Sequence, residues 1–311
     1  MRQIILRTRD VLMRLLTLDR RIDEIKINQG LVLCELQRGK PVASLSDVEF
    51  KVFSQWGEDG ILQFLIRELC IENRTFIEFG VEDFFESNSR FLLMKDLWKG
   101  YVIDGSQRNV ERLRRSYFYW KYPLKSRAAF ITRENVADLL DESGFDKRVG
   151  VMSVDVDGVD YYLLEALAEW RAEVIVVEYN SIFGARHAVS VPYSPGFSRS
   201  SAHHSNLYWG ASLTAFDYLL SGRGYSLVGV NSVGSNAFFV RRELLNERVK
   251  AVPVADCFRE SSFREARDER GELRMISARE GRDVIGHLPL VDVSSGAALR
   301  VAETFDSISV S

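Results

Sequence analysis

The feature that most restricts the fold is a series of short apolar runs, each followed by a segment of helical length, between about residues 53 and 242. The run Val174-Ile175-Val176-Val177 is apolar at consecutive positions, so other elements must cover both of its faces. Strands of this kind that alternate with helices are typical of βαβ units and a mainly parallel sheet. Five such strands are expected, at residues 75–80, 100–105, 127–132, 150–157 and 174–180.

A different pattern follows, in which a polar loop over residues 181–208 leads to a helix at 211–221 and two further strands at 225–232 and 236–242. Only three residues link these two strands, which is too short for a parallel crossover and predicts an antiparallel hairpin. The order predicts an α/β, Rossmann-like sheet of seven strands, mostly parallel with the last strand antiparallel. Methyltransferase-type sheets have this order, although other doubly wound enzymes share the connectivity.

The first forty or so residues show a helical heptad pattern. Its apolar seam, with one polar member, consists of Val11, Leu15, Leu18, Ile22, Ile25, Gln29, Val32 and Leu36. Such a helix either packs on its own domain or forms a coiled coil between subunits, which would make the protein a homo-oligomer. The expected organisation is an N-terminal helix over 1–45, a Rossmann-like domain over 46–250, and a charged extension and tail over 251–311.

Charge and cysteine usage exclude several classes of protein. Lys and Arg number 41 against 44 Asp and Glu, a net charge of -3 that predicts no nucleic-acid partner. The three cysteines form no CxxC pair, which argues against a zinc ribbon and fits a reducing compartment. No apolar run approaches the roughly 20 residues of a membrane span. We therefore expect a cytoplasmic protein without a transmembrane segment.

Acidic residues stand at the ends of the first two predicted strands. Glu78 precedes Gly80 at the end of the first strand, where a glycine allows close backbone approach to a ligand. Asp104 ends the second strand, the position at which an acid characteristically accepts hydrogen bonds from a ribose. The pair predicts an adenosine-binding βαβ unit. The alternative is that both acids only cap the helices that follow.

The next two strands also end in oxygen-bearing side chains. Asp155 and Asp157 alternate onto one side if the fourth strand stays regular, and Glu178 and Asn180 do the same on the fifth. Clustered carboxylates need a cation, a basic partner or a raised pKa. These four residues are candidate ligands of Mg²⁺. Alternatively, they form a polar network that positions a substrate.

The long loop after the fifth strand carries two adjacent histidines, His203 and His204. A histidine titrates near neutral pH and can take a proton from a hydroxyl nucleophile. Either residue is therefore a candidate base, together with Asp155 and Asp157 as catalytic residues. The alternative is an ordinary polar loop.

Several motifs occur in one order along residues 53–180: FSQWGED, FIEFG, SNS, LWKGYVID and SVDVDGVD. Together they resemble the FkbM-type methyltransferases, in particular the branch that opens with Ser-Gln-x-x-Glu-Asp. The resemblance implies a Rossmann-like fold that uses S-adenosylmethionine to methylate hydroxyl groups, often on sugars. It implies that the cofactor-binding residues are Gln55, Glu58, Asp59, Glu78, Gly80, Asn88 and Asp104.

One position departs from the family pattern. Phe84 stands where many relatives have a second glycine, although the branch in question often lacks it, and only its orientation decides whether the cofactor pocket is open. The expected function is an S-adenosylmethionine-dependent O-methyltransferase acting on a glycan or another polyhydroxylated small-molecule acceptor. The alternatives are a non-catalytic scaffold of the same fold in a glycan-assembly complex and a metal-dependent hydrolase or glycosyl-processing enzyme.

Overall fold

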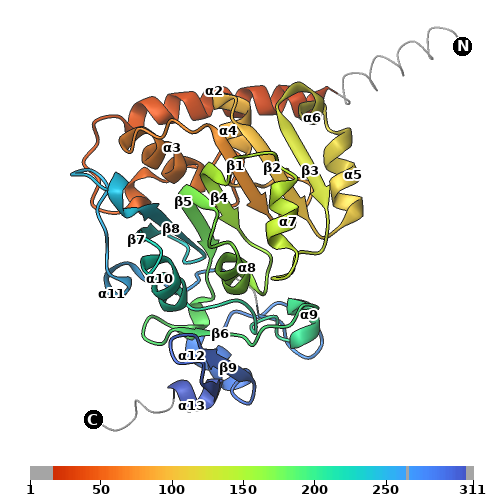
Figure 1. Ribbon diagram of the computed structural model, residues 1–311, viewed down its shortest axis with the longest axis vertical. Coiled ribbons are helices and arrows are strands. Elements are labelled where there is room, and N and C mark those ends of the chain that lie inside the picture. Colours follow the sequence, from red (N-terminus) through yellow and green to blue (C-terminus); the bar gives the residue numbers. More distant parts are fainter. Residues whose placement is uncertain (1–16, 264–265, 306–311) are drawn as a thin grey trace, which may run out of the picture.

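The computed structural model describes residues 17–263 and 266–305. Its main sheet has seven strands in the order β3-β2-β1-β4-β5-β8-β7 (Figure 1). The first five strands are parallel, and β8 is antiparallel to both β5 and β7, which confirms the predicted fold class. The strands are β1 (Thr75–Phe79), β2 (Lys99–Asp104), β3 (Leu124–Ala128), β4 (Arg148–Val154), β5 (Arg171–Glu178), β7 (Tyr225–Val230) and β8 (Asn236–Arg241).

Helices cover both faces of this sheet, as the doubly apolar strands require. Val174 and Val176 of β5 belong to one core, whereas Ile175 and Val177 belong to the other. The first core is closed by α2 (Leu18–Gln37), η1 (Leu45–Val48), α3 (Glu58–Glu68), α4 (Arg90–Asp96), α5 (Gln107–Arg115) and α6 (Tyr117–Lys121). The second is closed by α7 (Val136–Asp141), α8 (Asp160–Ala166), α10 (Leu213–Ser221) and, in part, α11 (Val254–Cys257).

The strand order reverses between β1 and β4. The chain runs from β1 outward to β3 and then returns to the other side of β1. In open parallel sheets a ligand lies beyond the carboxyl ends of the strands at such a point. The topology therefore places a binding site next to the ends of β1 and β4.

Two predicted strand boundaries are wrong. The third strand is Leu124–Ala128 rather than 127–132, because this edge strand pairs with β2 while only Leu124 is fully buried, so its sequence has no apolar run. The fourth strand stops at Val154, and Asp157 has a positive φ of 55°. The chain therefore turns before Asp157, and Asp155 and Asp157 do not alternate along a regular strand.

The long loop and the C-terminal extension fold together into a small unit. A three-stranded sheet joins β6 (Val189–Ser190) from the loop to two later strands, and a separate apolar core lies between this sheet and its helices. Besides β6, its elements are η2 (Ser181–Phe183), α9 (Arg199–Ala202), α12 (Ala278–Val284), β9 (Pro289–Asp292), β10 (Ala298–Arg300) and α13 (Val301–Phe305). The short η3 (Arg242–Leu244) directly follows β8. Among the described helices, none is long and apolar enough to cross a membrane.

Helix α2 packs on its own domain, but through the face opposite to the heptad seam. Its buried residues are Asp23, Gly30, Cys34 and Gln37. A Cβ at Gly30 would lie 2.5 Å from the ring of Phe91, so the helix approaches the domain closely through this glycine. The seam residues Val11 and Leu15 lie outside the described residues.

Candidate active site

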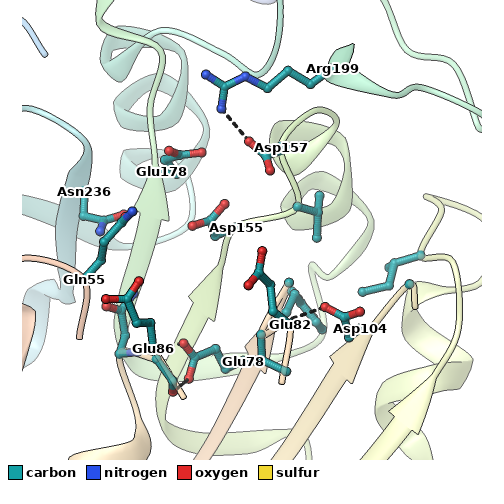
Figure 2. A pocket seen from close by; sticks show the side chains of 18 of the residues that line it. Gln55, Glu78, Glu82, Glu86, Asp104, Asp155, Asp157, Glu178, Arg199 and Asn236 are labelled. Atoms are coloured by element: carbon teal, nitrogen blue, oxygen red, sulfur yellow. Dashed lines mark hydrogen bonds and ion pairs between the residues drawn. The ribbon is translucent and has the colours of Figure 1, made fainter. Parts of the chain in front are cut away.

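A cavity of about 450 Å³ opens at the carboxyl ends of the central strands, as the topology predicts (Figure 2). Its volume lies in the range of about 300–1,000 Å³ that is usual for small-molecule sites. Among the described residues that line it, seven are acidic and one, Arg199, is basic. The acidic residues are Glu78, Glu82, Glu86, Asp104, Asp155, Asp157 and Glu178. This lining favours a ligand that carries positive charge.

Glu78 at the end of β1 organises the loop beside the cavity. Its carboxylate accepts hydrogen bonds from Ser87 Oγ at 2.7 Å, the Asn88 backbone N–H at 2.8 Å and the Ser89 backbone N–H at 3.1 Å. Burial raises the pKa of Glu78, and these hydrogen bonds oppose the increase. The same loop places Asn88 in the cavity lining. Glu78 thus holds the loop and also reaches the cavity.

Gly80 lets two strand ends meet. It has a φ of +70°, and a Cβ at this position would lie 1.6 Å from the backbone oxygen of Asp155. No side chain fits there without moving the end of β4. The glycine of the Glu78-x-Gly80 motif is therefore required by the packing of β1 against Asp155.

Asp104 lines the cavity and also ties two loops together. One carboxylate oxygen accepts from the Glu82 backbone N–H at 2.7 Å, and the other accepts from the Ser106 backbone N–H at 2.8 Å. The second oxygen also accepts from Asn109 Nδ2 at 3.4 Å, so both of its lone pairs are used, and only the oxygen bound to the Glu82 N–H can still accept from a ligand hydroxyl. Asp104 therefore caps the following segment and also lines the cavity.

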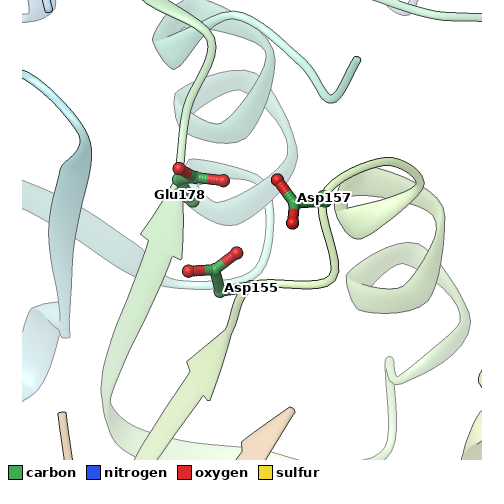
Figure 3. A group of neighbouring side chains, drawn as sticks. All are labelled: Asp155, Asp157 and Glu178. Carbon is green, nitrogen blue, oxygen red and sulfur yellow. The ribbon is translucent and has the colours of Figure 1, made fainter. Parts of the chain in front are cut away.

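Three carboxylates meet above the ends of β4 and β5. One oxygen atom each from Asp155, Asp157 and Glu178 lies within 4.8 Å of the others (Figure 3). Burial, Asp157 and Asp160 raise the pKa of Asp155 well above its usual range, while a hydrogen bond with Glu178 lowers it. Two ionised carboxylates cannot hydrogen-bond to each other, so this contact forms only while Asp155 or Glu178 carries a proton.

Asp157 and Asp160 fix the turn that carries this cluster. Asp157 pairs with Arg199 Nη1 at 2.6 Å, and the guanidinium of Arg199 lies 4.5 Å from the ring of Trp209. Asp160 accepts from the backbone N–H groups of Val156 at 2.7 Å and of Gly158 at 3.0 Å. Burial raises the pKa of Asp160 to about 6. The turn after β4 is therefore held from both sides.

The prediction that Asn180 joins the acidic cluster is corrected by the structure. Its Nδ2 donates to the backbone oxygens of Leu207 at 2.9 Å and Trp209 at 3.0 Å, and its Oδ1 accepts from Ile182 N–H. These bonds arise because β5 ends at Glu178 and Asn180 caps η2. The cavity is lined by a different amide, that of Asn236.

The histidines predicted as bases are not among the residues that line the cavity. His203 Nδ1 lies 2.7 Å from Ser205 Oγ, and the His203 ring lies 4.2 Å from that of His204 and 5.8 Å from that of His287. Burial and the two neighbouring imidazoles lower the pKa of His203. The loop folds onto the C-terminal unit, so it brings the histidines to His287 rather than to the acidic cluster.

The opening motif contributes Gln55 to the cavity lining, but Glu58 and Asp59 are buried outside it. Asp59 accepts from the backbone N–H groups of three consecutive residues, 52–54, each at 2.7 Å, and burial raises its pKa to about 6. Glu58 accepts from the side-chain amides of Asn231 at 2.7 Å and Asn236 at 2.9 Å. Both acids shape the cavity indirectly, Glu58 through Asn236.

Phe84 turns into the core and leaves the cavity beside Gly80 open. Its side chain is fully buried and stacks on Phe76, with ring centroids 6.4 Å apart and an interplanar angle of 8°. A positive φ of 65° at Phe84 accompanies this turn. Glu82, two residues earlier, lines the cavity instead.

The lining residues that the sequence did not predict include Glu82, Glu86, Asn236, Phe130, Phe197 and Phe263. The sequence could have predicted Asn236, because this residue begins an antiparallel strand at the edge of the sheet where the parallel strands end. Phe263 comes from the C-terminal extension, where its ring lies 5.1 Å from that of Trp56. No local pattern signals that contact.

Comparisons with known proteins find similar solved structures but no similar sequence. No family model matches the chain, and no curated protein has a significantly similar sequence. Similar solved structures include a putative O-methyltransferase from Klebsiella pneumoniae (10% identity, 69% of this chain and 87% of that chain, TM-score 0.39). An O-methyltransferase from Bacillus cereus in complex with SAH (12%, 69% and 88%, 0.41) and the SAH-bound N-terminal domain of EvdMO1 (12%, 71% and 94%, 0.39) are also similar.

Proposed function

We propose that this chain is an S-adenosylmethionine-dependent O-methyltransferase that acts on a glycan or another polyhydroxylated acceptor. The observation that carries the proposal is the acidic cavity at the point where the strand order reverses. S-adenosylmethionine has a sulfonium and an ammonium group against one carboxylate, so it is cationic. A cavity with seven acidic residues and one arginine suits such a ligand.

The residues around the cavity fit this cofactor. Asp104 has acceptor capacity left for one ribose hydroxyl, and Gly80 presents bare backbone beside it. Gln55 and Asn88 supply amides, and Phe84 leaves the space open. When bound, the cofactor supplies an electrophilic methyl group. The protein's own task is then to align the acceptor oxygen and to remove its proton.

Asp155 is the best placed base. Its raised pKa brings its proton affinity closer to that needed at neutral pH, and it lines the cavity, whereas His203 and His204 do not. Glu178 can take part in moving the proton through the hydrogen bond that it shares with Asp155. Asp157, held by Arg199, fixes the turn that carries the base.

The proposed acceptor follows from the remaining lining. Phe130, Phe197 and Phe263 supply aromatic surface, while Asp157 and Glu178 supply acceptors for hydroxyl groups. Aromatic faces combined with carboxylates suit a ring that has an apolar face and several hydroxyls. This is the chemistry of a sugar, in agreement with the resemblance of the motifs to FkbM-type enzymes.

A second candidate is favoured by the geometry of the carboxylate cluster. Asp155, Asp157 and Glu178 bring three oxygen ligands together, which suits a hard divalent cation such as Mg²⁺. With such an ion bound, all three groups would be ionised and Asp155 would be a ligand rather than a base. The cluster would then serve either an ion-assisted methyltransferase or a metal-dependent hydrolase.

Calorimetric titration with S-adenosylmethionine and with S-adenosylhomocysteine, each with and without Mg²⁺, separates these candidates. We expect saturable binding of both without Mg²⁺, weakened by Asp104→Ala. The matched control is Glu111→Ala, which removes an acid on α5 with a half-exposed side chain. Absence of binding under every condition would exclude the methyltransferase, and binding that requires Mg²⁺ would favour the ion-assisted form.

A further inference from the structure

The heptad seam of α2 faces solvent along the described part of the helix. Its apolar side chains are between 44% and 66% exposed, and they are Leu18, Ile22, Ile25, Val32 and Leu36. Figure 1 shows α2 along the outer edge of the molecule, with α3 and α4 on its inner side. A surface helix normally turns such a stripe toward its own core. Here the stripe is left uncovered.

Polar contacts on the opposite face fix this orientation. Asp23 forms a buried ion pair with Arg90 and accepts a hydrogen bond from Tyr117 Oη at 2.6 Å. Gln37 is buried, and its Nε2 donates to the backbone oxygen of Gly60 at 2.9 Å. Together with the close contact at Gly30, these interactions prevent the helix from rotating its seam inward. The exposed stripe is therefore a built feature of the fold.

We propose that the α2 seam of a second copy of this chain covers this stripe, as an antiparallel two-helix coiled coil. Seam residues at 18, 22, 25, 29, 32 and 36 alternate by four and three, the spacing that keeps a seam in contact with a partner helix. A helix that only packs on a domain needs no such repeat. In sequence the repeat continues upstream at Val11 and Leu15, which lie outside the described residues.

The charges of α2 favour a helix over a membrane surface as the occupant. Over residues 18–37 the helix has three basic and four acidic residues. Interfacial helices that bind anionic lipid are instead rich in Lys and Arg on the polar face. A partner helix with the same mixed charges suits this surface better.

The charges beside the seam select the antiparallel orientation. In a parallel pair, Arg21 would face Lys26 of the second copy, a repulsion made twice. In the antiparallel register that aligns residue 18 with residue 36, Arg21 instead lies beside Glu35 of the second copy. That attraction is also made twice, whereas the one like-charge approach in this register, Lys26 beside Lys26 of the second copy, is made once.

Sedimentation equilibrium of the full chain tests the proposal. We expect a concentration-dependent dimer whose dissociation constant rises at least about tenfold in Ile25→Glu, because each copy loses an apolar contact. Leu31→Glu is the matched control, since Leu31 is 45% exposed on the same helix but lies off the seam. Thermal unfolding by circular dichroism checks that Ile25→Glu leaves the fold intact, as expected for a side chain that is 66% exposed.

Charge reversal tests the orientation. Arg21→Glu should weaken the dimer, and Arg21→Glu combined with Glu35→Arg should restore it. A stronger dimer in Arg21→Glu would overturn the antiparallel pairing, because only a parallel pair gains from that change. A monomer at all concentrations, or a dimer that Ile25→Glu leaves unchanged, would overturn the proposal as a whole.

Discussion

Replacing Gly80 by alanine tests whether the strand ends meet as closely as the structure shows. The new Cβ would lie 1.6 Å from the backbone oxygen of Asp155, whereas real contacts of a Cβ stay beyond 3.0 Å. The end of β4 would have to retreat by more than an ångström. Alanine at a φ of +70° adds a backbone cost of about 1–2 kcal/mol.

Substitutions at two other glycines separate the backbone cost of a positive φ from the steric cost of the new Cβ. Gly39 has a φ of +72° with nothing within 4 Å, so Gly39→Ala should cost only the backbone term of about 1–2 kcal/mol. Gly105 ends the neighbouring strand, and a Cβ there would meet only Phe130 at 3.7 Å, so Gly105→Ala should be nearly neutral. Gly80→Ala carries both costs and should exceed about 4 kcal/mol, which reaches the exceptional range for a single substitution.

Urea denaturation followed by circular dichroism measures these differences, and calorimetry with S-adenosylmethionine measures their consequence. We expect Gly80→Ala to lose both stability and binding, because the displaced backbone belongs to Asp155. Equal costs for Gly80→Ala and Gly39→Ala would refute the close contact. Should Gly80→Ala prove too unstable to purify, its soluble yield beside that of Gly39→Ala gives the same ranking.

Four further predictions concern charge and packing. Burial raises the pKa of Asp160 to about 6, so the folded state holds this proton more tightly than the unfolded chain between about pH 4 and 6. The free energy of unfolding should therefore fall as pH rises through that interval, and Asp160→Asn should flatten the fall in urea titrations. Asp155→Asn should abolish methyl transfer to a sugar acceptor while calorimetry still detects the cofactor; retained transfer would exclude Asp155 as base. Added salt should weaken binding of cationic S-adenosylmethionine more than that of S-adenosylhomocysteine, and equal sensitivity would contradict the electrostatic argument. Phe84→Ala should cost about 3–5 kcal/mol of stability without closing the cavity.

The parts of the fold that the sequence predicts correctly are those where burial leaves a pattern. The central strands are covered on both faces, so their apolar runs are unbroken, as in Val174 to Val177. The edge strand β3 buries fully only Leu124, so its boundary is not visible in the sequence. Helix α2 shows the opposite problem. Its apolar pattern is clear, but the face that packs on the domain is formed by Gly30, Cys34 and two polar residues.

The residues of the candidate site also differ in how well the sequence predicts them. Residues at strand ends, such as Glu78, Asp104 and Glu178, reach the cavity because parallel strands bring their carboxyl ends to one edge. Residues in loops depend on contacts made far away in the sequence. His203 meets His287 instead of the acidic cluster, and Phe263 enters the cavity beside Trp56. No spacing rule connects positions that only the tertiary fold brings together.

Several carboxylates in and near the acidic cavity are held by backbone N–H groups. Glu78, Asp59 and Asp160 each accept two or more backbone N–H groups, which offset the cost of their burial. Asp155 has no such set among the described residues, and burial together with Asp157 raises its pKa. A fold selected for stability alone would not bring the carboxyl groups of Asp155, Asp157 and Glu178 together beside a cavity. A cationic ligand would offset the negative charge of these groups. It should therefore raise the free energy of unfolding by more than the area of its contact with the protein implies.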